Sequence, residues 1–184
     1  MFLVPDDGDG DRSCRYSVDL TSWHNIFSGK RDWSLGASEG LRVIQSGVAT
    51  GNLLGGCISI IAASLGTPFA AQLGGSVLFL EDIGTKPYQW DRLLLHLRYS
   101  GRLEGVRGIV FGDMAQCVAD DEQSLLERAI RHGLRGFDGP VAIGLRCGHV
   151  NGPNLSLPLG VSVRLDLSDA ENPQISFLEP AVSG

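Results

Sequence analysis

Residues 76–84 read SVLFLEDIG, an apolar run of strand length that ends in two adjacent carboxylates and a glycine. The next segment, 87–99, places apolar residues at helical spacing, with a proline in its first turn and a glycine just beyond its end. A buried strand followed by an amphipathic helix is typical of an α/β fold.

Strand and helix patterns alternate along most of the remaining chain. The sequence predicts strands at 41–46, 108–111, 140–144, 161–167 and 174–178, helices at 58–65 and 121–132, and a glycine-rich turn at 51–56. The last two strands are expected to pair antiparallel, which predicts an α/β domain with a mixed β-sheet flanked by helices. Residues 1–40 lack clear periodicity and are interpreted as a linker or interdomain segment, and residues 41–184 as a single domain.

The composition limits the class of protein. With 184 residues, of which 43% are hydrophobic, the chain has enough apolar side chains for one sizeable core. A net charge of −6 and a pI near 5.1 argue against a nucleic-acid or anionic-membrane surface. Four cysteines without a CxxC pair favour free thiols, so no cofactor or metal is expected. The acidic first residues and the lack of a membrane-length apolar run predict a cytoplasmic protein.

Glu81 and His149 are the candidate catalytic residues. Glu81 directly follows a predicted strand, at the carboxyl end where open α/β sheets bind ligands. His149 follows another predicted strand and is flanked by glycines, which allow a loop to turn a side chain into a cleft. A carboxylate that accepts a hydrogen bond from one imidazole nitrogen leaves the other nitrogen as a base. The alternative is that Glu81 or Asp82 caps the next element or pairs with an arginine such as Arg92.

Several motifs occur in the order found in one enzyme family. They are GG at 55–56, FLED at 79–82, PY at 87–88 with DR at 91–92, GIVFGD at 108–113, and GH at 148–149 followed by PNLSLPLG at 153–160. Through these motifs the chain resembles the LD-carboxypeptidase family of serine peptidases, over residues 41–166. The resemblance covers only the C-terminal domain of that family.

The resemblance implies a function shared between two domains. In the family, a serine on an N-terminal α/β domain attacks the amide that joins an L-residue to a terminal D-residue of a murein peptide. The C-terminal domain supplies the other two members of a Ser-Glu-His triad, which correspond here to Glu81 and His149. The implied partners are the N-terminal nucleophile-bearing domain of the same enzyme, a peptide with a terminal D-residue, and a second copy in a homodimer. Some relatives accept peptide–nucleotide conjugates, so the substrate class stays open.

The sequence contains no recognisable nucleophile for this chemistry. The family's serine lies in a Gly-x-Ser-Asp turn, and Ser46, Ser59 and Ser156 all lack that setting. The backbone donors for the oxyanion would belong to the N-terminal domain as well, so the chain alone is expected to be inactive. Two alternatives stay open: a non-catalytic peptide-binding module that keeps the cleft, and a hydrolase with an unrecognised nucleophile.

Three more residues are secondary candidates. Cys57 stands where the family often has Asn after the paired glycines, and a thiol cannot replace the hydrogen bonds of that amide. Cys57 and Cys147 could serve as nucleophiles, although cysteines in apolar surroundings are more often simply buried. Asp113 follows a predicted strand and is interpreted as an acid near the substrate.

Overall fold

The structure is a computed structural model, and it describes residues 17–114, 117–119, 122–150 and 152–182. Its strands are β1 (Trp33–Gly36), β2 (Arg42–Gln45), β3 (Val48–Cys57), β4 (Ser76–Glu81), β5 (Gly108–Gly112), β6 (Val141–Leu145), β7 (Ser162–Asp166) and β8 (Gln174–Phe177). Its helices are α1 (Leu20–Phe27), the short 3-10 helix η1 (Ala37–Glu39), α2 (Ile58–Ala63), α3 (Pro87–Tyr99) and α4 (Gln123–Gly133). Within the described ranges, no helix combines the length and the apolar character needed to cross a membrane.

One mixed sheet of eight strands organises this part of the chain, in the order β1-β8-β7-β3-β4-β5-β6-β2. The strands β3, β4, β5 and β6 run parallel to one another. At one side β2 joins β6 antiparallel, and at the other side β7, β8 and β1 continue antiparallel from β3. The expected α/β class with a mixed sheet is therefore confirmed, as is the antiparallel pairing of the last two strands.

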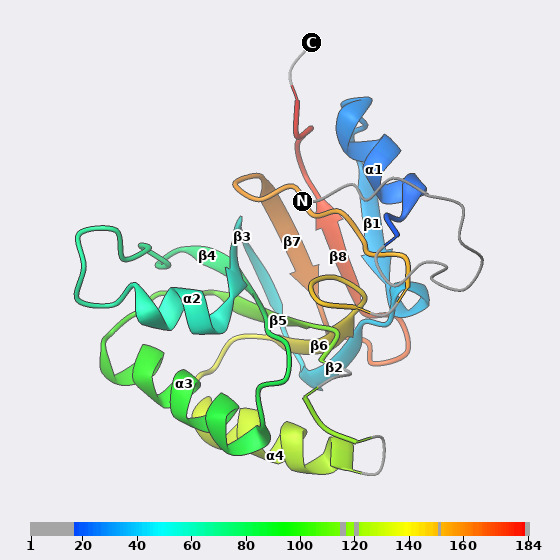
Figure 1. Ribbon diagram of the computed structural model, residues 1–184. Helices are drawn as coiled ribbons and strands as arrows, with labels where there is room; N and C mark the ends of the chain where they lie inside the picture. Colours follow the sequence, from blue (N-terminus) through cyan, green and yellow to red (C-terminus); the bar gives the residue numbers. More distant parts are fainter. Residues whose placement is uncertain (1–16, 115–116, 120–121, 151, 183–184) are drawn as a thin grey trace, which may run out of the picture.

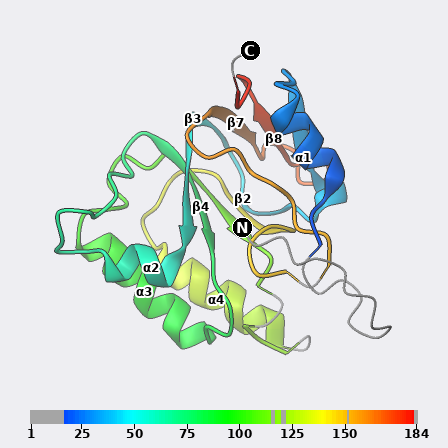
Figure 2. The same cartoon turned by 45° about the horizontal axis from the view of Figure 1, so that its top comes forward.

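The two faces of the sheet are covered differently. Figure 1 and Figure 2 both show α2, α3 and α4 together on one face, and α1 apart from them beside β8. The central strand β4 is buried on both faces, since Leu78 and Leu80 join the core beneath the helices, and Val77 and Phe79 join the core of the opposite face. Side chains alternate along a strand, so Glu81 leaves β4 on the face opposite the helices.

The strands and helices predicted from residue 41 onward are confirmed, with bounds that differ by a few residues. The prediction of a glycine-rich turn at 51–56 is wrong, because these residues belong to strand β3. A Cβ on Gly51 would lie 2.3 Å from the carbonyl oxygen of Gly75, and a Cβ on Gly55 would lie 1.8 Å from that of Phe79. Glycine in this strand reflects the close approach of a neighbouring backbone.

Part of the segment interpreted as a linker forms regular structure. Asp19 caps α1 by accepting a hydrogen bond from the Ser22 backbone N–H at 2.7 Å. Strand β1 forms one edge of the sheet, where Trp33 stacks on Phe177 with ring centroids 4.0 Å apart. The sheet therefore extends into residues 33–36, because a buried aromatic pair holds a strand that is too short to show periodicity in the sequence.

We expect Gly55→Ala to destabilise the domain far more than Gly56→Ala. Both glycines have φ angles that favour glycine, 135° and 142°, but nothing lies within 4 Å of a Cβ at Gly56. Backbone strain of about 1–3 kcal/mol acts at both positions. The overlap with Phe79 acts only at Gly55, so the free energies of unfolding should differ by more than about 2 kcal/mol, or Gly55→Ala should fail to fold. Urea denaturation measures this difference, and equal destabilisation would contradict the close strand contact.

Candidate functional site

Glu81 is the last residue of β4 and lies at the carboxyl edge of the parallel strands. Its side chain is only 9% exposed. Gly112 of β5 leaves room for it, because a Cβ on Gly112 would lie 3.0 Å from the Glu81 Cβ. A carboxylate that is almost excluded from water needs a hydrogen-bonding partner within the protein.

His149, in the loop that follows β6, is that partner. Its Nδ1 lies 2.6 Å from Glu81 Oε2, and its side chain is 42% exposed. The preceding Gly148 has a φ of 109°, and a Cβ there would lie 2.7 Å from the same Oε2. Glycine allows both this backbone conformation and this close approach to the carboxylate. The structure thus brings the two predicted site residues together from separate strand ends.

The hydrogen bond between Glu81 and His149 determines what the pair can do chemically. When Nδ1–H donates to the carboxylate, Nε2 carries a lone pair and can accept a proton. The carboxylate also stabilises the imidazolium that forms after proton transfer. In the part of the chain that the structure describes, no group of three His, Cys, Asp or Glu residues could hold a metal ion. The site is therefore suited to general acid–base chemistry on a proton brought to Nε2.

A second histidine–carboxylate pair shows what distinguishes the first. His132 of α4 lies with its Nδ1 2.6 Å from Asp91 Oδ1 of α3, so both pairs have the same separation. Asp91, however, is 29% exposed and His132 is 50% exposed, and the pair joins two helices away from the strand ends. A short distance alone does not identify a catalytic pair. The burial of Glu81 and its place at the carboxyl edge of the sheet set it apart.

Asp82 has a structural role beside Glu81. Its Oδ2 accepts hydrogen bonds from the hydroxyl of Ser59 and, at 3.3 Å, from the Ser59 backbone N–H. Its Oδ1 accepts a hydrogen bond from the Ile83 N–H at 2.8 Å. Cys57, the N-cap residue of α2, makes no side-chain capping bond, so Asp82 serves the start of this helix instead. Asp82 thus caps the preceding helix α2 and not the next element along the chain, whose N-cap is Lys86, and its partner Ser59 was not identified from the sequence.

The environments of two cysteines near Glu81 disfavour thiolate chemistry. Cys57 ends β3 opposite Glu81, and burial is the main cause that raises the pKa of its thiol. Burial and the negative charge of Glu81 raise the pKa of Cys147 to about 12, and its Sγ donates to the Leu155 carbonyl oxygen at 3.1 Å. The thiolate is the nucleophilic form of cysteine, so the geometry does not favour either residue as a nucleophile. Cys14 lies outside the described residues.

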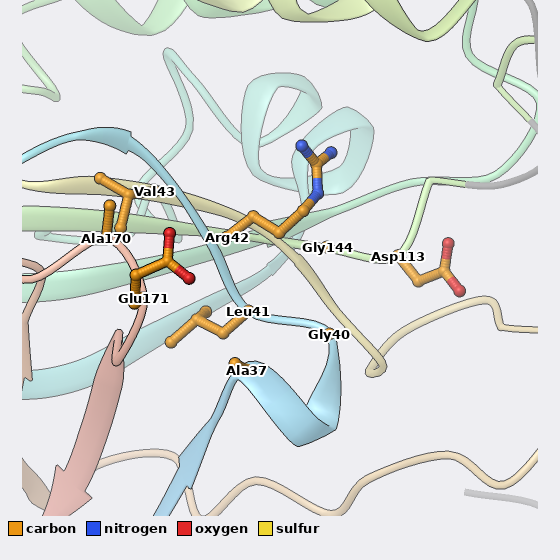
Figure 3. A pocket seen from close by; sticks show the side chains of 9 residues that line it. All are labelled: Ala37, Gly40, Leu41, Arg42, Val43, Asp113, Gly144, Ala170 and Glu171. Carbon is orange, nitrogen blue, oxygen red and sulfur yellow. The ribbon is translucent and has the colours of Figure 1, made fainter.

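Asp113 lines a cavity whose lining residues include neither Glu81 nor His149. The cavity has a volume of about 620 Å³ and lies between β2, β6 and the turn that joins β7 to β8 (Figure 3). Its charged lining residues are Arg42, Asp113 and Glu171. Figure 3 shows the Asp113 carboxylate turned away from the other two, so the three charges do not converge on one point. A role of Asp113 as an acid near the substrate stays a prediction.

Comparison with protein families finds a match that covers most of the sheet. A model of the LD-carboxypeptidase C-terminal domain matches residues 50–165. A Bacillus subtilis (strain 168) relative named "Probable murein peptide carboxypeptidase" is 35% identical over 131 residues, which are 70% of this chain and 41% of the relative. A Streptomyces coelicolor relative is 40% identical over 141 residues, which are 72% of this chain and 44% of the relative.

Solved structures show the same partial coverage. The muramoyltetrapeptide carboxypeptidase of Oxalobacter formigenes superposes with a TM-score of 0.73 at 25% identity, over 94% of this chain and 57% of that structure. The microcin C7 self-immunity protein MccF superposes with a TM-score of 0.64 at 26% identity, over 79% of this chain and 42% of that structure. The chain therefore spans about half the length of the relatives and structures that it matches.

We expect iodoacetamide to modify Cys57 only slowly in the folded protein, because burial raises the pKa of its thiol, and to leave Cys147 unmodified. Cys57 is partly exposed, whereas Cys147 is buried and has a thiol pKa of about 12. At pH 8 the raised pKa leaves almost no thiolate at Cys147, and the small fraction grows only as the pH rises toward that value. Peptide mass mapping before and after unfolding in urea measures the labelling. Fast labelling of Cys147 in the native state would contradict its burial and return it to the nucleophile candidates.

Proposed function

The chain belongs to the LD-carboxypeptidase family, and on that premise we propose that it is the C-terminal domain of a serine LD-carboxypeptidase that acts on murein peptides. In this proposal Glu81 and His149 complete a Ser-Glu-His triad, and an N-terminal domain supplies the serine. The observation that carries the proposal is the 2.6 Å contact between a buried carboxylate and a partly exposed imidazole at the ends of the parallel strands.

In the proposed mechanism His149 transfers protons, and Glu81 orients and stabilises its imidazole. His149 Nε2 takes the proton of the serine hydroxyl as its oxygen attacks the carbonyl carbon of the L,D-amide. The imidazolium is stabilised by Glu81, which also holds the ring in the tautomer that leaves Nε2 available. The same proton then goes to the amino group of the departing D-residue, and water releases the acyl group in a second round.

The serines described in this chain support a nucleophile from another domain. Ser59 donates its hydroxyl to Asp82, and the Ser156 backbone N–H is bound to Ser22, so both segments are held in the fold. Among the described residues, no serine hydroxyl is hydrogen-bonded to His149. The chain also covers only 41% to 57% of the relatives quoted above, which leaves room in them for a further domain.

We expect release of a terminal D-residue only when an N-terminal domain is present. The chain, fused to or mixed with the N-terminal half of the Bacillus subtilis relative, should release D-alanine from a murein tetrapeptide. His149→Ala should lower kcat/KM at least about 100-fold, because general acid–base catalysis contributes that much or more. His132→Ala is the matched control, since it removes a histidine from an equally short carboxylate pair outside the site. Equal turnover of His149→Ala and the control would remove His149 from the mechanism.

We expect the chain alone to form no adduct with a fluorophosphonate, which labels activated serines regardless of substrate. Intact mass of the folded protein gives the answer. An adduct that disappears in His149→Ala would show that this chain carries its own nucleophile. If the chain binds the tetrapeptide but the combined domains never cleave it, the protein is a peptide-binding module instead.

A further inference from the structure

Asn154 makes two hydrogen bonds to the residue that precedes His149. Its side-chain Nδ2 donates to the Gly148 carbonyl oxygen at 2.8 Å, and its Oδ1 accepts from the Gly148 N–H at 3.2 Å. One amide side chain therefore satisfies both polar groups of a single backbone residue. Gly148 would otherwise have wide conformational freedom, since it has no side chain and its φ is 109°. The two bonds fix the backbone directly before the imidazole.

The main chain of Asn154 is itself held by a segment far away in the sequence. Its N–H donates to the Ser17 carbonyl oxygen at 2.7 Å, and its carbonyl oxygen accepts from the Asp19 N–H at 2.9 Å. Two residues further on, the Ser156 N–H donates to the hydroxyl of Ser22 at 3.0 Å, and Ser22 is 2% exposed. Residues 17–22 thus bind the main chain of Asn154 and Ser156, while the Asn154 side chain binds the main chain of Gly148.

The position of His149 beside Glu81 depends on the order of its loop as well as on the hydrogen bond between them. The imidazole is 42% exposed, and a loop with glycines on both sides of the histidine loses conformational entropy when it is ordered. If other contacts already order the loop when the protein folds, the contact between His149 and Glu81 costs no further loop entropy. We propose that Asn154 is a positioning residue, which holds the Gly148–His149 backbone so that the imidazole stays within reach of Glu81, and that residues 17–22 hold Asn154 in place.

The significance of this role for catalysis rests on the proposed function, but the contact can be measured without a nucleophile or a substrate. In ¹⁵N-labelled protein, an imidazole N–H bound to a carboxylate is protected from solvent and gives its own resonance. The wild-type chain should show two such signals, from His149 and from His132, which has the same 2.6 Å separation from its carboxylate. Assignment follows from His149→Ala and His132→Ala.

We expect Asn154→Ala to lose the His149 Nδ1–H signal and to keep the His132 signal. The His132 signal serves as an internal reference for the folded state, because its pair joins α3 and α4. Asn172→Ala is the matched control: it removes an asparagine whose Nδ2 donates to Asp169 in the turn before β8, and both signals should persist. A His149 signal that is unchanged in Asn154→Ala would overturn the proposal.

A milder variant covers the case in which Asn154→Ala does not fold. Asn154→Asp keeps the oxygen that accepts from Gly148 N–H but replaces the donor to the Gly148 carbonyl with a second oxygen. Exchange of the His149 Nδ1 proton with water should become at least about tenfold faster, which corresponds to about 1.4 kcal/mol of lost protection. An unchanged exchange rate would contradict the positioning role. If the wild-type chain shows both signals, Asn154→Ala loses the His149 signal, and the combined domains are nevertheless inactive, the result counts against the proposed function and not against the role of Asn154.

Discussion

The parallel pairing of β3 with β4 is the constraint on which the site depends. Gly55 lies so close to the Phe79 carbonyl oxygen that no side chain fits between the strands, and this contact fixes which residues of the two strands face each other. The register ends with Cys57 opposite Glu81. Because successive side chains of a strand point to opposite faces, a slip of one residue would turn Glu81 toward the helices and away from His149.

Glu81 and Asp82 are consecutive, and as whole residues each is 6% exposed, so two adjacent residues of the chain carry buried carboxylates. A buried charge is tolerated only when hydrogen bonds or opposite charges compensate for the lost water. Asp82 is compensated by Ser59 at the start of α2, and Glu81 by His149 in the loop on the other face. This dipeptide therefore connects the helical layer to the histidine loop. Loss of the imidazole would remove the hydrogen bond that Glu81 accepts from His149, whereas Asp82 would keep the backbone N–H donors of Ser59 and Ile83 if the Ser59 hydroxyl were lost.

The sequence predicts those features whose cause is local. Strand β4 and helix α3 follow from apolar spacing, and Glu81 from its place at the end of the apolar run 76–80. The prediction of a turn at Gly55 is wrong because the reason for glycine there is not local. The atom that leaves no room for a side chain at this position belongs to Phe79 on another strand. The hydrogen bonds of Asn154 that hold the loop before His149 could not be predicted for a similar reason. They link irregular segments, and such bonds leave no periodic signal in the sequence.

The Glu81–His149 pair is formed by residues of this chain alone, and this preorganisation limits what a second domain has to contribute. Rearranging charged groups during a reaction is costly, whereas dipoles and charges that are already oriented act at no further cost. Under the proposed function, the second domain would bring a serine hydroxyl to within about 2.6–3.2 Å of Nε2, together with donors for the oxyanion. The hydroxyl would approach Nε2 of this partly exposed imidazole, because Nδ1 is bound to Glu81.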